Sequence, residues 1–170
     1  MYKEKIYALE YSNHINKLLE KGILLNTNGD KFNSMVIGWG HIGVIWEIDT
    51  FVVYVRQSRY TKSQIDKTKE FTISVPLENV DPEITRIMGS KSGRDINKAD
   101  YVRVVNPQTN KTPGILEYPL TIECEVIYSQ DQELQNIDED VRKRCYPSGS
   151  PDDFHTAYIG RIVDAYIIKE

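Results

Sequence analysis

The stretch Gly38-Trp39-Gly40-His41-Ile42-Gly43-Val44-Ile45-Trp46-Glu47-Ile48-Asp49-Thr50 decides between two fold classes. Its first part matches the GxGxxG pattern of dinucleotide-binding proteins, in which the glycine-rich turn leads directly into a helix. Here only residues 44–50 separate the pattern from the next predicted strand, Phe51–Val55. They are rich in β-branched and aromatic types and too few for a crossover helix. The stretch therefore argues against a doubly wound fold, and its glycines indicate close approach to a neighbouring strand or a flat ligand.

Short strands surround this stretch on both sides, which predicts a mainly β, α+β fold with a few peripheral helices. Apolar alternation and β-branched runs predict strands at Ile23–Leu25, Phe32–Trp39, Phe51–Val55, Phe71–Val75, Pro119–Tyr128 and Phe154–Ile168, the last interrupted near Gly160. Helix-like spacing, Thr61 as an N-cap and the start Asp81-Pro82 predict helices at 9–21, 61–70 and 82–88. In the strand 119–128, Thr121, Glu123 and Glu125 form a polar face. Turn-forming residues predict loops at 26–30, 89–97 and 106–114.

Length and charge narrow the class of protein further. The 170 residues suit one domain, 1–170, with a sizeable core. The net charge of −4 does not suit a nucleic-acid-binding domain. No apolar run is long enough for a membrane span, and the N-terminus has no signal-peptide pattern. Cys124 and Cys145 lie far apart without a CxxC motif or nearby histidine, so we expect no disulfide scaffold, no metal site and a cytoplasmic protein.

Two cationic, hydroxyl-bearing segments are candidates for anion binding. Arg56-Gln57-Ser58-Arg59-Tyr60-Thr61 stands where a strand leads into a helix, whose free N–H groups and dipole attract anions. Ser90-Lys91-Ser92-Gly93-Arg94 is the second segment. Together they favour a phosphate monoester or diphosphate, although composition alone is equally compatible with two solvated surface loops.

The chain resembles the flavin reductase-like, FMN-binding split-barrel family, to which flavoredoxin belongs. Seven segments carry the resemblance in the family's order, from about residue 20 to the C-terminus: Asn33–Gly40, Val55-Arg56, Ser58–Thr61, Phe71–Pro76, Ser92-Gly93-Arg94-Asp95 with Lys98, Leu120–Val126 and Phe154–Gly160. The resemblance implies a split β-barrel of Greek-key type. Two positions depart from the family, since Val36 stands where threonine is common and proline is missing near Asp49-Thr50.

The resemblance also implies which residues hold the flavin. The strand Asn33, Ser34, Met35, Val36, Ile37 and Gly38 would lie against the isoalloxazine ring and bind its polar edge through the backbone. The junction Arg56, Gln57, Ser58, Arg59, Tyr60 and Thr61 would hold the phosphate. The loop Ser90, Lys91, Ser92, Gly93 and Lys98 would close over the cofactor, and His155 would lie near the reactive face, where a nicotinamide stacks. A structural role for His155 is an equal alternative.

By the same resemblance the protein is a flavoprotein oxidoreductase that uses FMN rather than FAD and passes electrons from NAD(P)H to an acceptor. An alternative is a non-enzymatic electron carrier of the flavoredoxin type, which exchanges electrons with a redox protein partner. A third option is a flavin- or haem-binding sensor. The resemblance implies a homodimer, and the apolar runs Phe51–Val55 and Val44-Ile45-Trp46 independently predict that this region needs cover from a second copy.

The remaining distinctive side chains have structural interpretations. We expect Trp39 and Trp46 to be packing residues and Cys124 to be a small buried residue. His14 and His41 show no partner in the sequence. The basic run Arg142-Lys143-Arg144 follows an acidic one, which is typical of a solvated, self-neutralising face.

Overall fold

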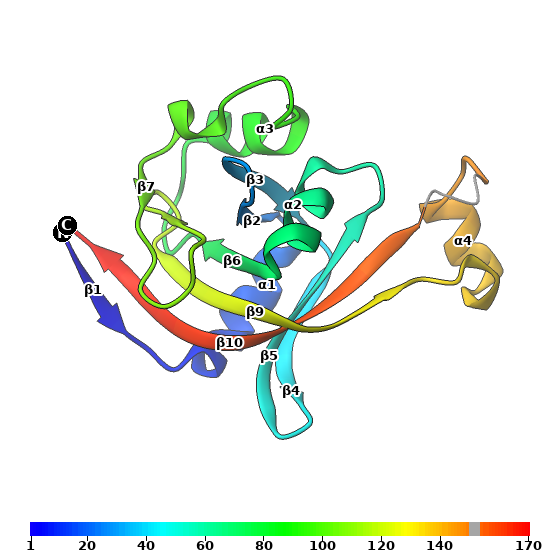
Figure 1. Cartoon of the computed structure of the whole chain (residues 1–170), viewed down its shortest axis with the longest axis horizontal. Coiled ribbons are helices and arrows are strands. Elements are labelled where there is room, and N and C mark those ends of the chain that lie inside the picture. The colour runs from blue at the N-terminus through cyan, green and yellow to red at the C-terminus, as the bar shows by residue number, and fades with distance from the viewer. Residues whose placement is uncertain (150–153) are drawn as a thin grey trace.

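The computed structural model describes residues 1–149 and 154–170, which form a mostly β fold around a curled antiparallel sheet (Figure 1). Eight strands make this sheet, in the order β3-β2-β6-β9-β10-β5-β4, with β1 paired to β10. The sheet does not close, because β3 and β4 stand at its two ends. The expected mainly β split barrel with a few peripheral helices is therefore confirmed.

The strands of the main sheet are β1 Tyr2–Lys5, β2 Ile23–Asn28, β3 Phe32–Ile37, β4 Gly40–Ile45, β5 Ile48–Arg56, β6 Glu70–Val75, β9 Leu120–Asp131 and β10 His155–Lys169. A separate pair consists of β7 Val104–Val105 and β8 Gly114–Ile115. The helices are α1 Ser12–Leu19, α2 Tyr60–Thr68, α3 Pro82–Ser90 and α4 Glu139–Cys145, with 3-10 turns η1 Ala8–Tyr11, η2 Lys98–Tyr101 and η3 Leu134–Asn136.

The main core lies where β5, β6 and β9 face α1. Phe51 of β5, Phe71 of β6 and Ile122 of β9 are fully buried there, and Ile15 and Leu19 of α1 join the same cluster. Within β5, Phe51, Val52, Val53 and Val55 are at most 3% exposed. The chain therefore covers this strand by itself, and the expectation that Phe51–Val55 needs a second copy for cover is wrong.

The glycine in β10 explains why this strand is continuous rather than interrupted. A Cβ at Gly160 would lie 2.5 Å from Phe71 Cζ on β6 and 2.8 Å from Cys124 Cβ on β9. Only glycine therefore leaves room for these two side chains next to β10. The register between β9 and β10 shifts at this point, between Ile159 and Gly160, as in a β-bulge. Cys124 is fully buried, as expected, and burial raises the pKa of its thiol.

The deciding stretch 38–50 forms a hairpin, which confirms that no helix follows the glycines. β4 pairs with β5 through a two-residue turn, because Ile45 faces Ile48 and the intervening Trp46 and Glu47 have φ of 55° and 59°. β5 accordingly begins at Ile48 rather than at Phe51. At Gly40 a Cβ would lie 2.6 Å from the Val52 carbonyl oxygen, so the close approach is to a neighbouring strand.

Several boundaries differ from the expected ones. The predicted turn at 26–30 is wrong in its first half, since β2 runs through Asn28 and buries Asn26, whose Nδ2 donates to Ser74 Oγ over 2.8 Å. Helix α2 begins at Tyr60, and Arg59 rather than Thr61 is its N-cap. The predicted helix 9–21 consists of the 3-10 turn η1 followed by α1. Asp81 caps α3 as expected, its side chain accepting from the Glu83 N–H.

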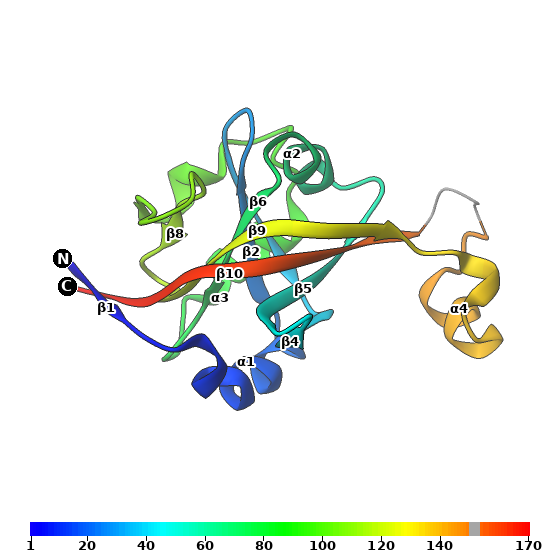
Figure 2. The same cartoon turned by 60° about the horizontal axis from the view of Figure 1, so that its bottom comes forward.

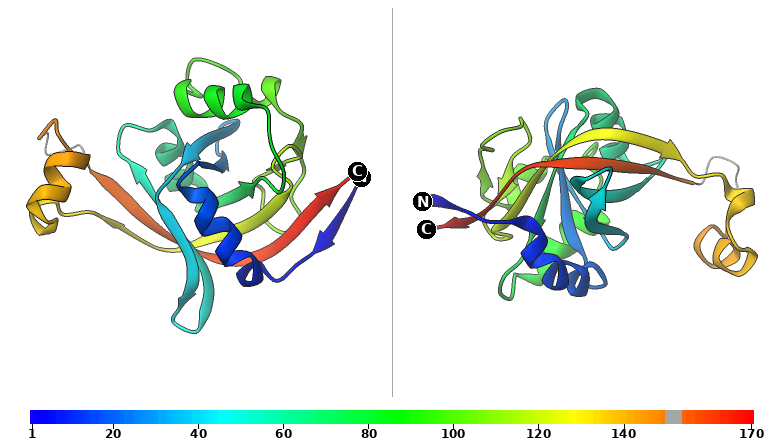
Figure 3. Two further views of the ribbon diagram at one scale, coloured as in Figure 1. Left: turned by 180° about the vertical axis from the view of Figure 1, so that it is seen from behind. Right: turned by 90° about the horizontal axis from the view of Figure 1, so that it is seen from below.

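The sequence analysis did not predict several short elements, which are β1, β4, the pair β7 and β8, the 3-10 turns η2 and η3, and helix α4. The short β1 is polar and mostly exposed and forms by pairing with β10. The outer parts of β9 and β10 project from the body and carry η3 and α4 (Figure 2); we call this projection, residues 127–149 and 154–159, the arm. Figure 3 shows it on the opposite side of the molecule from the two termini. Helix α4 buries none of its residues, which agrees with a solvated charged face.

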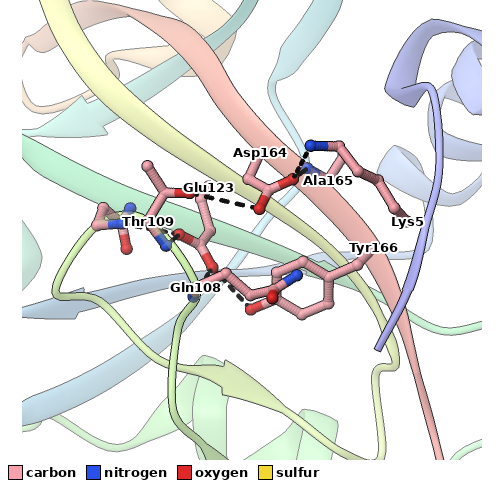
Figure 4. Close-up of polar contacts among 8 residues, drawn as sticks. Lys5, Gln108, Thr109, Glu123, Asp164, Ala165 and Tyr166 are labelled. Atoms are coloured by element: carbon pink, nitrogen blue, oxygen red, sulfur yellow. Dashed lines mark hydrogen bonds and ion pairs between the residues drawn. The ribbon is translucent and has the colours of Figure 1, made fainter. Parts of the chain in front are cut away.

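A buried carboxylate fastens the loop 106–113 to the sheet (Figure 4). Glu123 is fully buried and accepts hydrogen bonds from the backbone N–H groups of Gln108, Thr109 and Asn110 at 2.6–2.8 Å. It also accepts from Tyr166 Oη at 2.8 Å. Burial, reinforced by this carboxylate, raises the pKa of Tyr166 far above its usual range. The polar face predicted for β9 is therefore covered at Glu123, while Glu125 on the same strand is exposed.

Candidate functional site

A cavity of about 220 Å³ lies beside β3, between the start of α2 and the loop after α3. We call it the edge cavity, because β3 ends the sheet and no described strand pairs with its outer side. Twelve residues expected at a flavin site line it: Asn33, Met35, Val36, Ser58, Arg59, Tyr60, Thr61, Ser90, Lys91, Ser92, Gly93 and Lys98. Met88, Gly89 and Arg94 complete the lining.

The lining is cationic. It contains Arg59, Lys91, Arg94 and Lys98 and no carboxylate. The guanidinium of Arg59 makes no hydrogen bond or ion pair with the described part of the chain, so its donors are available to a ligand. Arg94 Nη1 donates to the Ser58 carbonyl oxygen at 3.2 Å, and its guanidinium lies 5.3 Å from the Tyr60 ring centre. With the N-terminus of α2 beside them, these groups form a binding surface suited to a phosphate.

Close packing holds the loop 90–94 against β3 and α2. Asn33 Nδ2 donates to Thr61 Oγ1 at 2.9 Å and so links β3 to the first turn of α2. A Cβ at Gly93 would collide with Asn33 Oδ1 and lie 2.9 Å from Tyr60 Cδ1. Gly93 is therefore the residue that lets the loop come close enough to wall the cavity.

Lys98 lines the edge cavity and is itself buried. It is 2% exposed, and its ammonium donates to the main-chain oxygens of Ser34 on β3 and Met88 on α3, the latter at 2.9 Å. Burial, reinforced by the neighbouring charge of Arg59, lowers the pKa of Lys98 to about 8.

Five expected flavin-binding residues do not line the cavity. Ile37 is buried in the core, and Gly38 is exposed beyond β3. Ser34 is buried, and its Oγ has no hydrogen-bond partner within the described residues. Arg56 Nη2 donates to the Cys145 carbonyl oxygen at 3.1 Å, and Gln57 Nε2 donates to Thr156 Oγ1 at 2.7 Å. Arg56 and Gln57 thus contact the arm and β10, not the edge cavity.

His155 lies in an aromatic cluster at the base of the arm. Its Nδ1 is 2.8 Å from Tyr146 Oη, and its ring centre is 4.7 Å from that of Trp39. Arg56 lies over the Tyr146 ring at 5.3 Å. The structure therefore gives His155 hydrogen-bonded structural contacts and does not bring it to the lining of the edge cavity. A hollow of about 710 Å³ adjoins this cluster beside α4, but it contains none of the expected flavin residues.

Trp39 and Trp46 are 44% and 60% exposed, so they lie outside the core, but each packs against another ring. The ring centre of Trp39 is 4.7 Å from that of His155, and the ring centre of Trp46 is 5.9 Å from that of Tyr128. His14 has a partner that the sequence did not show, because its Nε2 lies 2.8 Å from the Pro76 carbonyl oxygen.

Comparison with known proteins places the chain in a family. Residues 19–170 match the model of the flavin reductase like domain, so the chain belongs to this family. No curated protein sequence matches it. Among solved structures, flavoredoxin from Methanosarcina acetivorans is similar at TM-score 0.65 and 24% identity, over 87% of this chain and 68% of that one. An FMN-binding protein from Thermus thermophilus is similar at 0.63 and 17% (86% and 70% covered), and a Streptomyces globisporus NADH:FAD oxidoreductase at 0.63 and 15% (86% and 75%).

Membership of this family implies a flavin, and the edge cavity fits its phosphate-bearing part. The fit rests on the carboxylate-free cationic lining and on the helix N-terminus beside it. The described residues contain no group of three or more His, Cys, Asp or Glu side chains able to hold a metal ion. Over the same residues, no helix combines the length and the apolar character that crossing a bilayer requires.

Proposed function

We propose that this chain, acting as one domain, is an FMN-binding oxidoreductase that passes electrons from NAD(P)H through the flavin to an acceptor. The observation that carries the proposal is the edge cavity, where Arg59, the start of α2 and the loop 90–94 lie together. Arg59 has no hydrogen bond or ion pair with the described part of the chain, and the cavity lining contains no carboxylate. Flavin supplies the hydride and electron chemistry, while the protein binds and orients it. The free thiols of Cys124 and Cys145 suit a cytoplasmic setting.

Different residues would bind the phosphate and the ring of the flavin. Arg59, Ser58 and the first N–H groups of α2 would hold the phosphate. The outer side of β3, at Asn33, Met35 and Val36, would support the ring through backbone groups and apolar contact. Val36 offers no hydroxyl, so main-chain groups carry the polar contacts at that position. The family resemblance favours FMN over FAD, since the second phosphate and the adenine of FAD would need extra room past Arg59.

Anaerobic reduction of the FMN-loaded protein separates the reductase from an electron carrier. We expect stopped-flow mixing with NADH or NADPH to bleach the flavin absorbance at a rate that saturates with nucleotide concentration. A protein that binds FMN but is reduced only by a protein donor would be a flavoredoxin-type carrier instead.

A second copy of the chain would complete the site. The cavity volume of about 220 Å³ is below the roughly 300–1,000 Å³ typical of ligand sites, so the flavin ring needs additional cover. Large apolar side chains on the hairpin β4–β5 and beside it are exposed, including Val44 at 59%, Trp46 at 60% and Tyr128 at 43%. We propose that this surface forms a twofold dimer interface.

Trp46→Glu should therefore convert a dimer into a monomer, because it places a charge in the proposed interface. Light scattering should give twice the chain mass for the unaltered protein and the chain mass for the variant. As a control, Tyr101→Glu changes a 45% exposed aromatic residue outside this surface and should leave the dimer intact. A monomeric unaltered protein that binds FMN fully would disprove the role of the second copy.

A further inference from the structure

A row of small polar side chains is buried on one face of β3, β2 and β6, which are neighbours in the sheet (Figure 1). Asn26 on β2 lies opposite Ser34 on β3 and opposite Thr72 on β6. Directly opposite residues of antiparallel strands project to the same face, so these three side chains are adjacent. All three are completely buried. We call them the polar row.

The loop 106–113 contacts the polar row. Thr72 Oγ1 donates to the Thr112 main-chain oxygen at 2.8 Å, and the Thr112 side chain is itself completely buried. Other hydrogen bonds join this loop to β1, β2, β6, β9 and β10. Over the part of the chain that the structure describes, none joins it to β3. The loop is therefore fastened to the strands around β3 but not directly to β3 itself.

Unpaired polar atoms gather in the polar row and in the residue that covers it. Of the four buried side-chain atoms without a hydrogen-bond partner among the described residues, three lie here: Ser34 Oγ, Asn26 Oδ1 and Thr112 Oγ1. The amide of Asn26 is held at its other end, since Nδ2 donates to Ser74 Oγ at 2.8 Å. Buried polar atoms in proteins nearly always have a partner, which is either another protein group or an ordered water. Three exceptions in one place therefore point to a small ligand.

The chemistry of the three atoms favours water over an ion. An amide oxygen only accepts, so Asn26 Oδ1 needs a donor and does not suit an anion, whereas the hydroxyls of Ser34 and Thr112 can donate or accept. A cation is disfavoured, because the ammonium of Lys98 already binds the Ser34 main-chain oxygen and would repel it. Water both donates and accepts, and an internal water typically bonds to about three polar groups.

The spacing of the strands sets how many waters are needed. Neighbouring strands lie about 4.8 Å apart, and one water bonded to two groups spans up to about 5.6 Å, so it joins neighbours in the row but not its two ends. We propose that two internal waters bind here, one between Ser34 Oγ and Asn26 Oδ1 and the other between Asn26 Oδ1 and Thr112 Oγ1. The amide oxygen has two lone pairs and accepts from both. The waters connect the loop 106–113 to β3, and their binding does not depend on a flavin.

A high-resolution crystal structure of the unaltered protein tests the proposal directly. We expect two peaks of electron density, each at about 2.7–3.2 Å from its two partners. Absence of either peak, for example because Ser34 Oγ donates directly to Asn26 Oδ1, would overturn the proposal. Crystals soaked in rubidium bromide test for ions, because rubidium and bromide both scatter anomalously. An anomalous peak at this site would equally overturn the assignment to water.

Thr112→Val removes one partner of the second water and keeps the shape of the side chain. Oxygen-17 magnetic relaxation dispersion, which counts waters that stay bound for longer than the protein tumbles, should show one long-lived water fewer than in the unaltered protein, and the melting temperature should fall. An unchanged number of waters, or the higher melting temperature expected when an unpaired buried hydroxyl is removed, would overturn the proposal.

Thr121→Val is the matched control for this measurement. Thr121 is also completely buried, but its Oγ1 already donates to the Pro119 main-chain oxygen at 3.3 Å, so the number of long-lived waters should not change. If Thr112→Val does not fold, Ser34→Ala tests the other water in the same way. The number of long-lived waters should again fall by one, and an unchanged number would overturn the proposal.

Discussion

Arg59→Ala should weaken FMN binding by about 10- to 100-fold and leave riboflavin binding almost unchanged. A hydrogen bond to a charged group contributes about 1.5–3 kcal/mol, which corresponds to this range of affinity. Arg59 lines the edge cavity and has no hydrogen bond or ion pair with the described part of the chain, so its removal disturbs few protein contacts. Because Arg59 is exposed, the difference between variant and parent should shrink as salt is added. Fluorescence titration with both flavins measures it.

Arg56→Ala is the informative comparison. Both arginines belong to the predicted phosphate segment, but Arg56 donates to the Cys145 carbonyl oxygen at the base of the arm. Arg56→Ala should therefore retain FMN affinity within about threefold, a difference of under 1 kcal/mol. Equal losses in the two variants, or a larger loss in Arg56→Ala, would show that the phosphate is not held in the edge cavity.

Glu123→Leu should reduce the free energy of unfolding by about 3–5 kcal/mol, the largest stability effect we expect of a single substitution here. The carboxylate accepts from three consecutive backbone N–H groups and from Tyr166 Oη, and its loss leaves the Asn110 N–H and the Tyr166 hydroxyl buried without this partner (Figure 4). Urea unfolding followed by circular dichroism measures the change.

Glu125→Leu is the control for this stability effect. It makes the same chemical change on the same strand, but Glu125 is exposed, so we expect a change within about 0.5 kcal/mol. Similar losses in both variants would mean that the loop 106–113 does not depend on Glu123.

Sequence patterns predicted the strands best where burial on both faces produces long apolar runs. Phe51–Val55 and Phe71–Val75 lie within β5 and β6. Residues 44–50, which were predicted to be too few for a helix, form no helix in the structure. The alternation in 119–128 located β9 correctly but misassigned its polar face. Glu123 is buried by a loop near it only in space, and alternation alone does not distinguish solvent from a covering loop.

Composition located the phosphate segment, residues 56–61, in the sequence. It did not show in which direction the side chains of this segment point. Arg56 still belongs to β5 and opposes His155 of β10, whereas Arg59 follows the strand and caps α2. Which guanidinium reaches the cavity thus depends on where the strand ends and the helix begins, and boundaries are poorly determined by sequence. Arg94 was noted only as part of a cationic loop, and its contact with Ser58 is a tertiary one.

Helix α4 had a signal in Asp138 followed by acidic and then basic residues, but no buried face to confirm it.

The most direct test of the central claim is a titration of the flavin-free protein with FMN, followed by absorbance and by mass spectrometry of the flavin released on denaturation. The edge cavity predicts a shifted flavin spectrum that saturates at one FMN per chain, with FMN rather than FAD retained when both are offered. An unshifted spectrum and no flavin recovered after desalting, in a protein that is folded by circular dichroism, would contradict the assignment of this chain as an FMN-binding oxidoreductase.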